Sequence, residues 1–312
     1  MPTNSVTLLD GGTGRELKRM GAPFRQPEWS ALALMEAPEY VTRVHEAYVA
    51  AGAEVITTNS YAVVPFHIGE ERFHAEGAAL AALAGRLARA VAEHAYAGPS
   101  KRRVSVAGCL PPIAGSYRPE RFDAAFATPI LKTLIAALAA NVDLWLAETL
   151  SATAEADLVG PLVAGSGKPL WLSFTLADCG EGAGGTRSER CVLRSGESVA
   201  LAVECALRHK AEALLFNCSQ PEVMGGAVEE AVRAVAAQSA PLRIGVYANA
   251  FAPARVVSEA NAALSAMRGD VTPEAYRAWA RDWIGRGATI VGGCCGVGPE
   301  HIQALNSVVV RR

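Results

Sequence analysis

Eight short apolar segments alternate with longer amphipathic segments along the whole sequence, and this alternation constrains the fold more than any other feature. The short segments are almost continuously apolar, which is typical of strands buried on both faces of a parallel sheet. The longer segments place apolar residues at positions i, i+3 and i+4, which indicates helices. We therefore predict strands at residues 7–10, 55–59, 104–108, 144–148, 170–175, 213–217, 244–248 and 289–293, and helices at residues 39–51, 76–95, 130–140, 198–209, 228–238 and 272–286.

The number and order of these segments predict one closed barrel. Strands that are each followed by a helix, within 312 residues, fit a single (β/α)8 TIM barrel of the α/β class better than two open sheets. An open, doubly wound sheet is the alternative. Because no Pro/Ser-rich linker or change of composition divides the chain, we expect residues 1–312 to form a single domain.

Charge and composition exclude several classes of partner. The net charge is −2, from 29 basic and 31 acidic residues, so nothing indicates electrostatic binding of nucleic acid or of an anionic membrane. The N-terminus has no basic region followed by an apolar region, and the most apolar stretch, residues 130–150, is interrupted by Lys132, Asn141 and Asp143. We expect a cytoplasmic protein, a monomer or small homo-oligomer, in which the odd number of cysteines, seven, is not a disulfide framework.

Polar residues gather at the carboxyl ends of the predicted strands, which is unusual in a chain that is 51% hydrophobic. In a barrel these ends converge on one mouth, where active sites are built. Carboxylates, thiols and other hydrogen-bonding groups are therefore expected to share one cleft. The residues concerned are Asp10, Gly11, Gly12, Thr57, Tyr61, Glu148, Asn217, Cys218, Asn249, Cys294 and Cys295.

The strongest signal is the group formed by Cys218, Cys294 and Cys295. Three thiolates suit tetrahedral Zn²⁺ and leave one position open, as a catalytic zinc site requires. Adjacent strand residues point to opposite faces, so Cys294 and Cys295 can share a metal only where the backbone turns, which the flanking glycines allow. Two alternatives stay open: cysteines that pack as small apolar residues, and a redox-active vicinal disulfide.

The two strand-end carboxylates, Asp10 and Glu148, could together hold a substrate ammonium group, because a desolvated cation needs paired acceptors. The backbone N–H groups of Gly11 and Gly12, with Thr57, could receive a carboxylate. Singly, Asp10 could instead cap a turn and Glu148 could pair with an arginine. A glycine-rich segment, residues 180–185, is predicted to be a long loop on the same face, without an assigned role.

Several sequence motifs of the chain resemble those of a known family. Its motifs are Asp10-Gly-Gly-Thr-Gly-Arg-Glu-Leu17, Thr58-Asn-Ser-Tyr61, Ala147-Glu-Thr149, Phe216-Asn-Cys-Ser219 and Gly292-Gly-Cys-Cys-Gly296, and in this order they look like those of the homocysteine S-methyltransferases. The resemblance implies a (β/α)8 barrel with a catalytic zinc on Cys218, Cys294 and Cys295. It further implies that Asp10, Gly11, Thr57 and Glu148 hold the amino acid, and that Tyr61 lies near the metal.

The resemblance also bears on the methyl donor. Betaine-using members carry an aromatic residue after the motif glutamate, where this chain has Thr149, and cobalamin-dependent members carry large extra domains. The short Asp-Gly-Gly motif is similar to that of members that use S-methylmethionine, and sometimes S-adenosylmethionine. One departure is Cys109-Leu-Pro-Pro-Ile, where many such members have Gly-Ser-x-Gly-Pro-Tyr-Gly.

The expected activity is methyl transfer from such a sulfonium donor to homocysteine, giving methionine. The alternatives are betaine as donor, selenohomocysteine as acceptor, a vicinal-dithiol redox protein, and a non-catalytic zinc or thiol binder.

Overall fold

The eight strands form one parallel sheet in the order β1-β8-β7-β6-β5-β4-β3-β2, in a computed structural model that describes residues 5–99, 101–178, 191–252 and 266–309. A parallel bridge between Leu9 and Val55 joins the two ends of the sheet and closes the barrel. The Asp10 N–H donates to the Val55 carbonyl at 3.0 Å across this junction. The strands are β1 (Thr7–Leu8), β2 (Val55–Thr57), β3 (Ser105–Leu110), β4 (Leu144–Leu150), β5 (Leu170–Phe174), β6 (Ala213–Asn217), β7 (Arg243–Tyr247) and β8 (Ile290–Val291).

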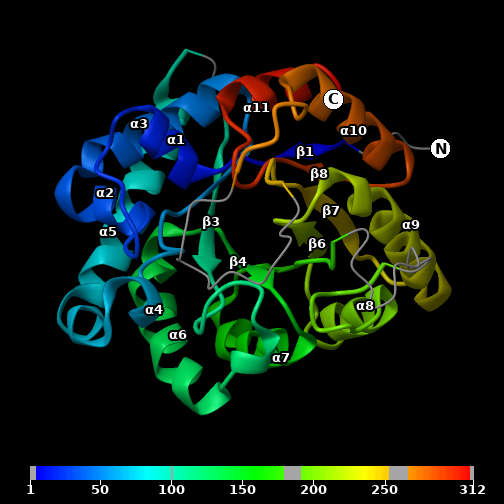
Figure 1. Cartoon of the computed structure of the whole chain (residues 1–312), viewed down its shortest axis with the longest axis horizontal. Coiled ribbons are helices and arrows are strands. Elements are labelled where there is room, and N and C mark those ends of the chain that lie inside the picture. The colour runs from blue at the N-terminus through cyan, green and yellow to red at the C-terminus, as the bar shows by residue number, and fades with distance from the viewer. Residues whose placement is uncertain (1–4, 100, 179–190, 253–265, 310–312) are drawn as a thin grey trace.

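Helices surround the barrel, and their colours run in sequence order around it (Figure 1). They are α1 (Thr13–Arg19), α2 (Ser30–Glu36), α3 (Pro38–Ala51), α4 (Pro65–Ile68), α5 (Glu70–Ala97), α6 (Ala124–Leu138), α7 (Thr153–Val163), α8 (Val199–Arg208), α9 (Pro221–Gln238), α10 (Pro273–Gly285) and α11 (Pro299–Asn306). The prediction of a TIM barrel is confirmed, and the open-sheet alternative is wrong.

The strand period explains why polar residues collect inside the mouth. Side chains alternate between the two faces of a strand, so residues two apart share a face. On β4, Leu144 and Leu146 pack in the core cluster inside the barrel, and Glu148 follows on the same face at the carboxyl end. On β2, Val55 packs in that cluster and Thr57 follows. The interior is therefore apolar below and polar at the mouth.

The observed strand bounds lie within two residues of the predicted bounds, whereas helices α5, α6 and α9 begin six or seven residues earlier than predicted. Helix α6 begins at Ala124, because Asp123 caps it by accepting the Ala125 N–H at 2.8 Å. Helix α9 begins at Pro221 and includes Gly225 and Gly226, which have low helix propensity. A Cβ at Gly226 would lie 2.7 Å from the Cys191 sulfur, so close packing against the segment around Cys191 favours glycine here.

Helix α6 also bears on the expectation that the chain does not bind a membrane. Among the described residues, Ala124–Asn141 is the one segment long and apolar enough to cross a bilayer by length and composition. One such helix is weak evidence by this test, and α6 packs against α5 and β3 in the outer ring of the barrel. The segment is therefore weak evidence for a membrane span.

Candidate active site

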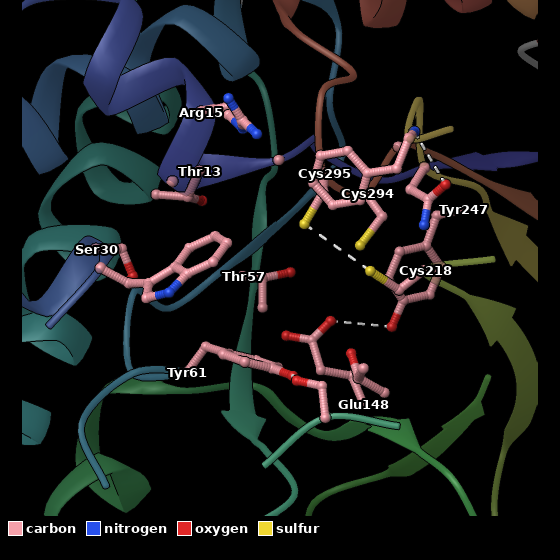
Figure 2. A pocket seen from close by; sticks show the side chains of 18 of the residues that line it. Thr13, Arg15, Ser30, Thr57, Tyr61, Glu148, Cys218, Tyr247, Cys294 and Cys295 are labelled. Carbon is pink, nitrogen blue, oxygen red and sulfur yellow. Dashed lines mark hydrogen bonds between the residues drawn. The ribbon is translucent and has the colours of Figure 1, made fainter. Parts of the chain in front are cut away.

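A cavity of about 340 Å³ opens at the carboxyl ends of the strands. Figure 2 shows the three cysteine sulfurs pointing toward one another, with Glu148 and Tyr247 beside them and Thr57 and Tyr61 in the same view. All the residues predicted for the site line this cavity except Asn217. The barrel thus brings together side chains from β1, β2, β4, β6, β7 and β8.

The ligand atoms of Cys218, Cys294 and Cys295 all lie within 4.8 Å of one another, and the sulfurs of Cys218 and Cys295 are 3.8 Å apart. Two sulfurs bound to one tetrahedral zinc ion, with Zn–S bonds of about 2.3 Å, lie about 3.8 Å apart. All three thiols are free rather than disulfide-bonded. The spacing and the soft thiol ligands fit a tetrahedral metal ion with its fourth position open.

The turn after β8 is built so that both adjacent thiols reach this point. The Gly293 N–H donates to the Asp10 carbonyl, and the Cys294 N–H donates to the Ala248 carbonyl, each at 2.9 Å. A Cβ at Gly293 would lie 2.1 Å from the Val297 side chain, so only glycine fits. The turn is therefore fixed between β1 and β7, which confirms the prediction that glycines let the backbone turn here.

Tyr117, in the loop after β3, covers the thiol cluster. Its hydroxyl lies 2.9 Å from the Cys218 sulfur and 3.2 Å from the Cys218 carbonyl oxygen. Its ring lies under the guanidinium of Arg194 at 4.9 Å. Hydrogen-bond donation to a thiolate stabilises its charge, so Tyr117 supports the charged form of Cys218.

Asp10 is buried at the end of β1 and is held by Thr57. The Thr57 N–H donates to one carboxylate oxygen at 2.7 Å, and the Thr57 hydroxyl donates to the other at 3.1 Å. Burial, and to a smaller extent the nearby charge of Glu148, raise the pKa of Asp10 to about 8 although the Thr57 hydrogen bonds lower it. A carboxylate in this state gains from a cation beside it.

Glu148 is the second buried carboxyl group of the cavity, and it accepts a hydrogen bond from the Tyr247 hydroxyl at 3.1 Å. Burial raises the pKa of Glu148 to about 7. Two buried carboxyl groups in one cavity, both costly to ionise, gain from a cation between them, whose charge offsets both.

The sequence profile described as "Homocysteine S-methyltransferase" matches residues 7–309. The chain belongs to the homocysteine S-methyltransferase family. It is therefore a methyltransferase, and the assignment supports homocysteine as the methyl acceptor.

Individual relatives are distant but align over nearly the full chain. Homocysteine S-methyltransferase YbgG of Bacillus subtilis is 27% identical over 98% of this chain and 95% of its own. A selenocysteine Se-methyltransferase of Brassica oleracea is 27% identical over 99% of this chain and 90% of its own. The crystal structure of the homocysteine methyltransferase MmuM from Escherichia coli, metallated form, has a TM-score of 0.73 at 26% identity, covering 97% of this chain and 96% of that one.

Within this homocysteine S-methyltransferase barrel, three sequence predictions need correction. The Gly12 N–H donates to the Val297 carbonyl at 3.0 Å, so this donor is already used and is not free for a substrate carboxylate. Thr57 commits both its donors to Asp10 and positions that carboxyl group instead. Asn217 is fully buried and bonds Thr149 and Ser173, so it ties β4, β5 and β6 together rather than contacting substrate.

The other predicted residues take the following places. Gly11 lines the cavity, where a Cβ would lie 2.3 Å from the Val297 carbonyl oxygen. Asn249 lines it too and accepts the Phe251 N–H at 3.2 Å. The Tyr61 hydroxyl lies 2.6 Å from the Ser116 hydroxyl, whereas Tyr117 is the tyrosine that contacts a thiol.

Sequence reasoning missed Tyr117, Tyr247 and the pair formed by Arg194 and Asp178, all of which line the cavity. Tyr247 lies within the predicted strand 244–248 and could have been found from the period of that strand. The others lie in loops, where no periodicity signals an inward side chain. The glycine-rich residues 180–185 lie outside the described residues.

Proposed function

We propose that this methyltransferase moves a methyl group from a sulfonium amino acid, S-methylmethionine or secondarily S-adenosylmethionine, to homocysteine, and that zinc is its cofactor. The observation that carries the proposal is the 3.8 Å spacing of sulfurs in a three-cysteine cluster within one cavity that also holds two buried carboxyl groups. The partners are small molecules only.

Cys218, Cys294 and Cys295 are the residues that would hold the zinc, and their sulfur spacing fits it. Zinc bound there would lower the pKa of the acceptor thiol, which is ordinarily about 8.5. The acceptor sulfur would then react as a thiolate. Tyr117 supports the charge on Cys218 by donating a hydrogen bond to its sulfur.

Asp10 and Glu148 bind the ammonium group of homocysteine. Their pKa values, raised by burial to about 8 and about 7, mean that both ionise readily only when a cation is present. Thr57 and Tyr247 orient the two carboxyl groups by donating hydrogen bonds to them. The acceptor sulfur is thereby fixed at the opposite end of the amino acid, toward the thiol cluster.

In the transfer step the thiolate sulfur attacks the donor methyl carbon. A new C–S bond forms, the C–S bond of the sulfonium breaks, and its electron pair stays on the donor sulfur, which becomes a neutral thioether. An anion and a cation thus become two neutral products. A site from which water is excluded favours such charge loss, and alignment of the three atoms lowers the barrier further.

Separate assays with each donor test the proposal. Purified, zinc-loaded protein is given homocysteine with S-methylmethionine, S-adenosylmethionine or betaine, and methionine is measured. We expect product from the sulfonium donors, and product from betaine alone would refute the donor assignment.

Metal analysis tests the cofactor. Wild-type protein is compared with Cys218→Ala, Cys294→Ala and Cys295→Ala. The control is Cys191→Ala, because Cys191 belongs to no group of possible metal ligands among the described residues and does not line the cavity. We expect one zinc per chain in the wild type and the control, and loss of zinc and activity in the others. Full zinc content and activity in the Cys294→Ala, Cys295→Ala double variant would exclude the proposed site. Those results would favour a redox or binding role.

A further inference from the structure

An ion pair in the cavity wall is not used by the acceptor site described above. The guanidinium of Arg194 donates to both carboxylate oxygens of Asp178, at 2.9 and 3.1 Å. Both residues line the cavity, and their side chains are 23% and 13% exposed. Paired opposite charges facing a cavity match the two charges of an amino-acid head group.

Backbone hydrogen bonds hold Asp178 and Arg194 side by side. An antiparallel bridge joins Leu176 to Leu193, and the Arg194 N–H donates to the Thr175 carbonyl at 3.0 Å. The segment after β5 and the segment before α8 are thus joined as a short ladder that holds Asp178 beside Arg194. The pair therefore lies where these two segments meet, at the mouth of the barrel.

Arg194 keeps one hydrogen-bond donor that Asp178 does not use. Asp178 engages the two terminal nitrogens of Arg194, and the Nε atom of Arg194 is buried without a hydrogen-bond partner among the described residues. A buried donor without a partner is costly, so an arginine in this state gains from a second acceptor.

Other charged groups of the cavity have different partners. Asp10 and Glu148 are both acidic and serve the ammonium of the acceptor. Arg118 pairs with Glu120, and the guanidinium of Arg15 lies 5.5 Å from the centre of the Phe251 ring. Among the described residues that line the cavity, Arg194 and Asp178 alone present both signs side by side.

The distance from the thiol cluster also fits. Arg194 lies 4.9 Å from the centre of the Tyr117 ring, and the Tyr117 hydroxyl lies 2.9 Å from the Cys218 sulfur. With about 2.8 Å from ring centre to hydroxyl oxygen, the guanidinium is at most about 11 Å from that sulfur. A sulfonium amino acid places its head group roughly 5 Å from its own sulfur, so a donor whose methyl group faces the acceptor sulfur can reach the pair.

We propose that Arg194 and Asp178 bind the amino-acid end of the methyl donor, with Arg194 taking its carboxylate and Asp178 its ammonium group. This inference rests on the proposed function and makes the pair the determinant of donor class. A donor with both groups exchanges one ion pair for two. Betaine has no N–H to offer Asp178, so it leaves that carboxylate without a matching donor.

Steady-state kinetics with matched variants test the pair. Arg194→Met keeps the length of the side chain and removes the charge, Asp178→Asn keeps the shape, and Arg286→Met removes an arginine that is paired with Asp282 on the outer surface. The donors are S-methylmethionine and dimethylsulfoniopropionate, a sulfonium with a carboxylate but no ammonium group. Homocysteine is kept saturating, and its own KM is measured in parallel.

We expect Arg194→Met to raise the KM for S-methylmethionine about tenfold to hundredfold, because charge-assisted hydrogen bonds are lost. The KM for homocysteine and the zinc content stay unchanged. Asp178→Asn raises the KM for S-methylmethionine but not for dimethylsulfoniopropionate, and Arg286→Met changes neither. An unchanged KM for S-methylmethionine in Arg194→Met, or an equal rise for homocysteine, overturns the inference.

The two proposals fail in different ways. If wild-type protein makes methionine from betaine alone, the proposed function fails. Calorimetric titration of S-methylmethionine into the zinc-loaded, homocysteine-bound wild type and Arg194→Met then tests separately whether Arg194 and Asp178 bind this donor. Tighter binding to the wild type supports it, and equal or absent binding overturns it.

Discussion

The buried carboxyl group of Asp10 makes a quantitative prediction about the substitution Asp10→Asn. The pKa of Asp10 is about 8 in the folded protein and 3.8 in the unfolded chain. Between these values the folded state holds a proton that the unfolded state lacks, so the free energy of unfolding falls by about 1.4 kcal/mol for each pH unit as the pH rises. Asparagine does not ionise, so the variant escapes this loss.

The stability gain of Asp10→Asn therefore grows with pH. It is near zero at pH 4 and reaches about 4 kcal/mol at pH 7. The local hydrogen bonds allow the change, because an amide oxygen accepts the Thr57 N–H, now 2.7 Å from the carboxylate, and the amide nitrogen can donate to the Thr57 hydroxyl. The variant loses its affinity for the homocysteine ammonium, so stability rises as function falls.

Chemical denaturation of the two zinc-loaded proteins at pH 5, 6, 7 and 8 measures this difference. Glu46→Gln, on the exposed face of α3, is the control and changes little at any pH. A difference between wild type and Asp10→Asn that stays constant with pH would show that Asp10 is not held neutral by burial. A variant less stable than wild type at pH 7 would refute the reasoning outright.

Three further predictions follow from the same physical terms. The KM for homocysteine falls as the pH rises from 6 to 8, since Asp10 and Glu148, with pKa values of about 8 and about 7, must ionise to bind the ammonium group; a KM that is flat or rising over this range would contradict that role. His45 is fully buried and its pKa is lowered by burial to about 4 from 6.5, so stability present above pH 6.5 is lost as the pH falls to 4. The loss is about 3 kcal/mol, and thermal unfolding of His45→Leu against pH should lack it. Tyr117→Phe removes the hydrogen bond to the Cys218 sulfur and should weaken zinc binding about tenfold in a chelator competition, whereas Tyr61→Phe should not.

The fold was predictable because the strands and helices of the barrel have a strongly periodic pattern of apolar residues. Continuous apolar runs mark the buried strands, and the end of each run marks the mouth, so Cys218, Glu148 and Asp10 could be assigned to one site before any coordinates. The helix start at Pro221 was missed although Pro at the first helical position and Glu222 in the first turn both signal it, because two glycines within α9 have low helix propensity.

The partners of the site residues were less predictable than the residues themselves. Thr57 and Gly12 lie where the sequence placed them, but their donors are used by Asp10 and Val297. Which of two nearby acceptors a donor meets depends on fractions of an ångström, which no residue pattern encodes. Tyr117 and Arg194 reach the cavity from loops, whose course is set by contacts rather than by period.

The junction between the first and last strands sets the order in which the metal site can assemble. The turn after β8 is held by Asp10, through the bond from the Gly293 N–H, and it carries two of the three thiols. A chain that has formed only its first seven strands has one thiol of the cluster, Cys218, in place. The complete three-sulfur cluster can therefore form only after the final strand has docked beside β1.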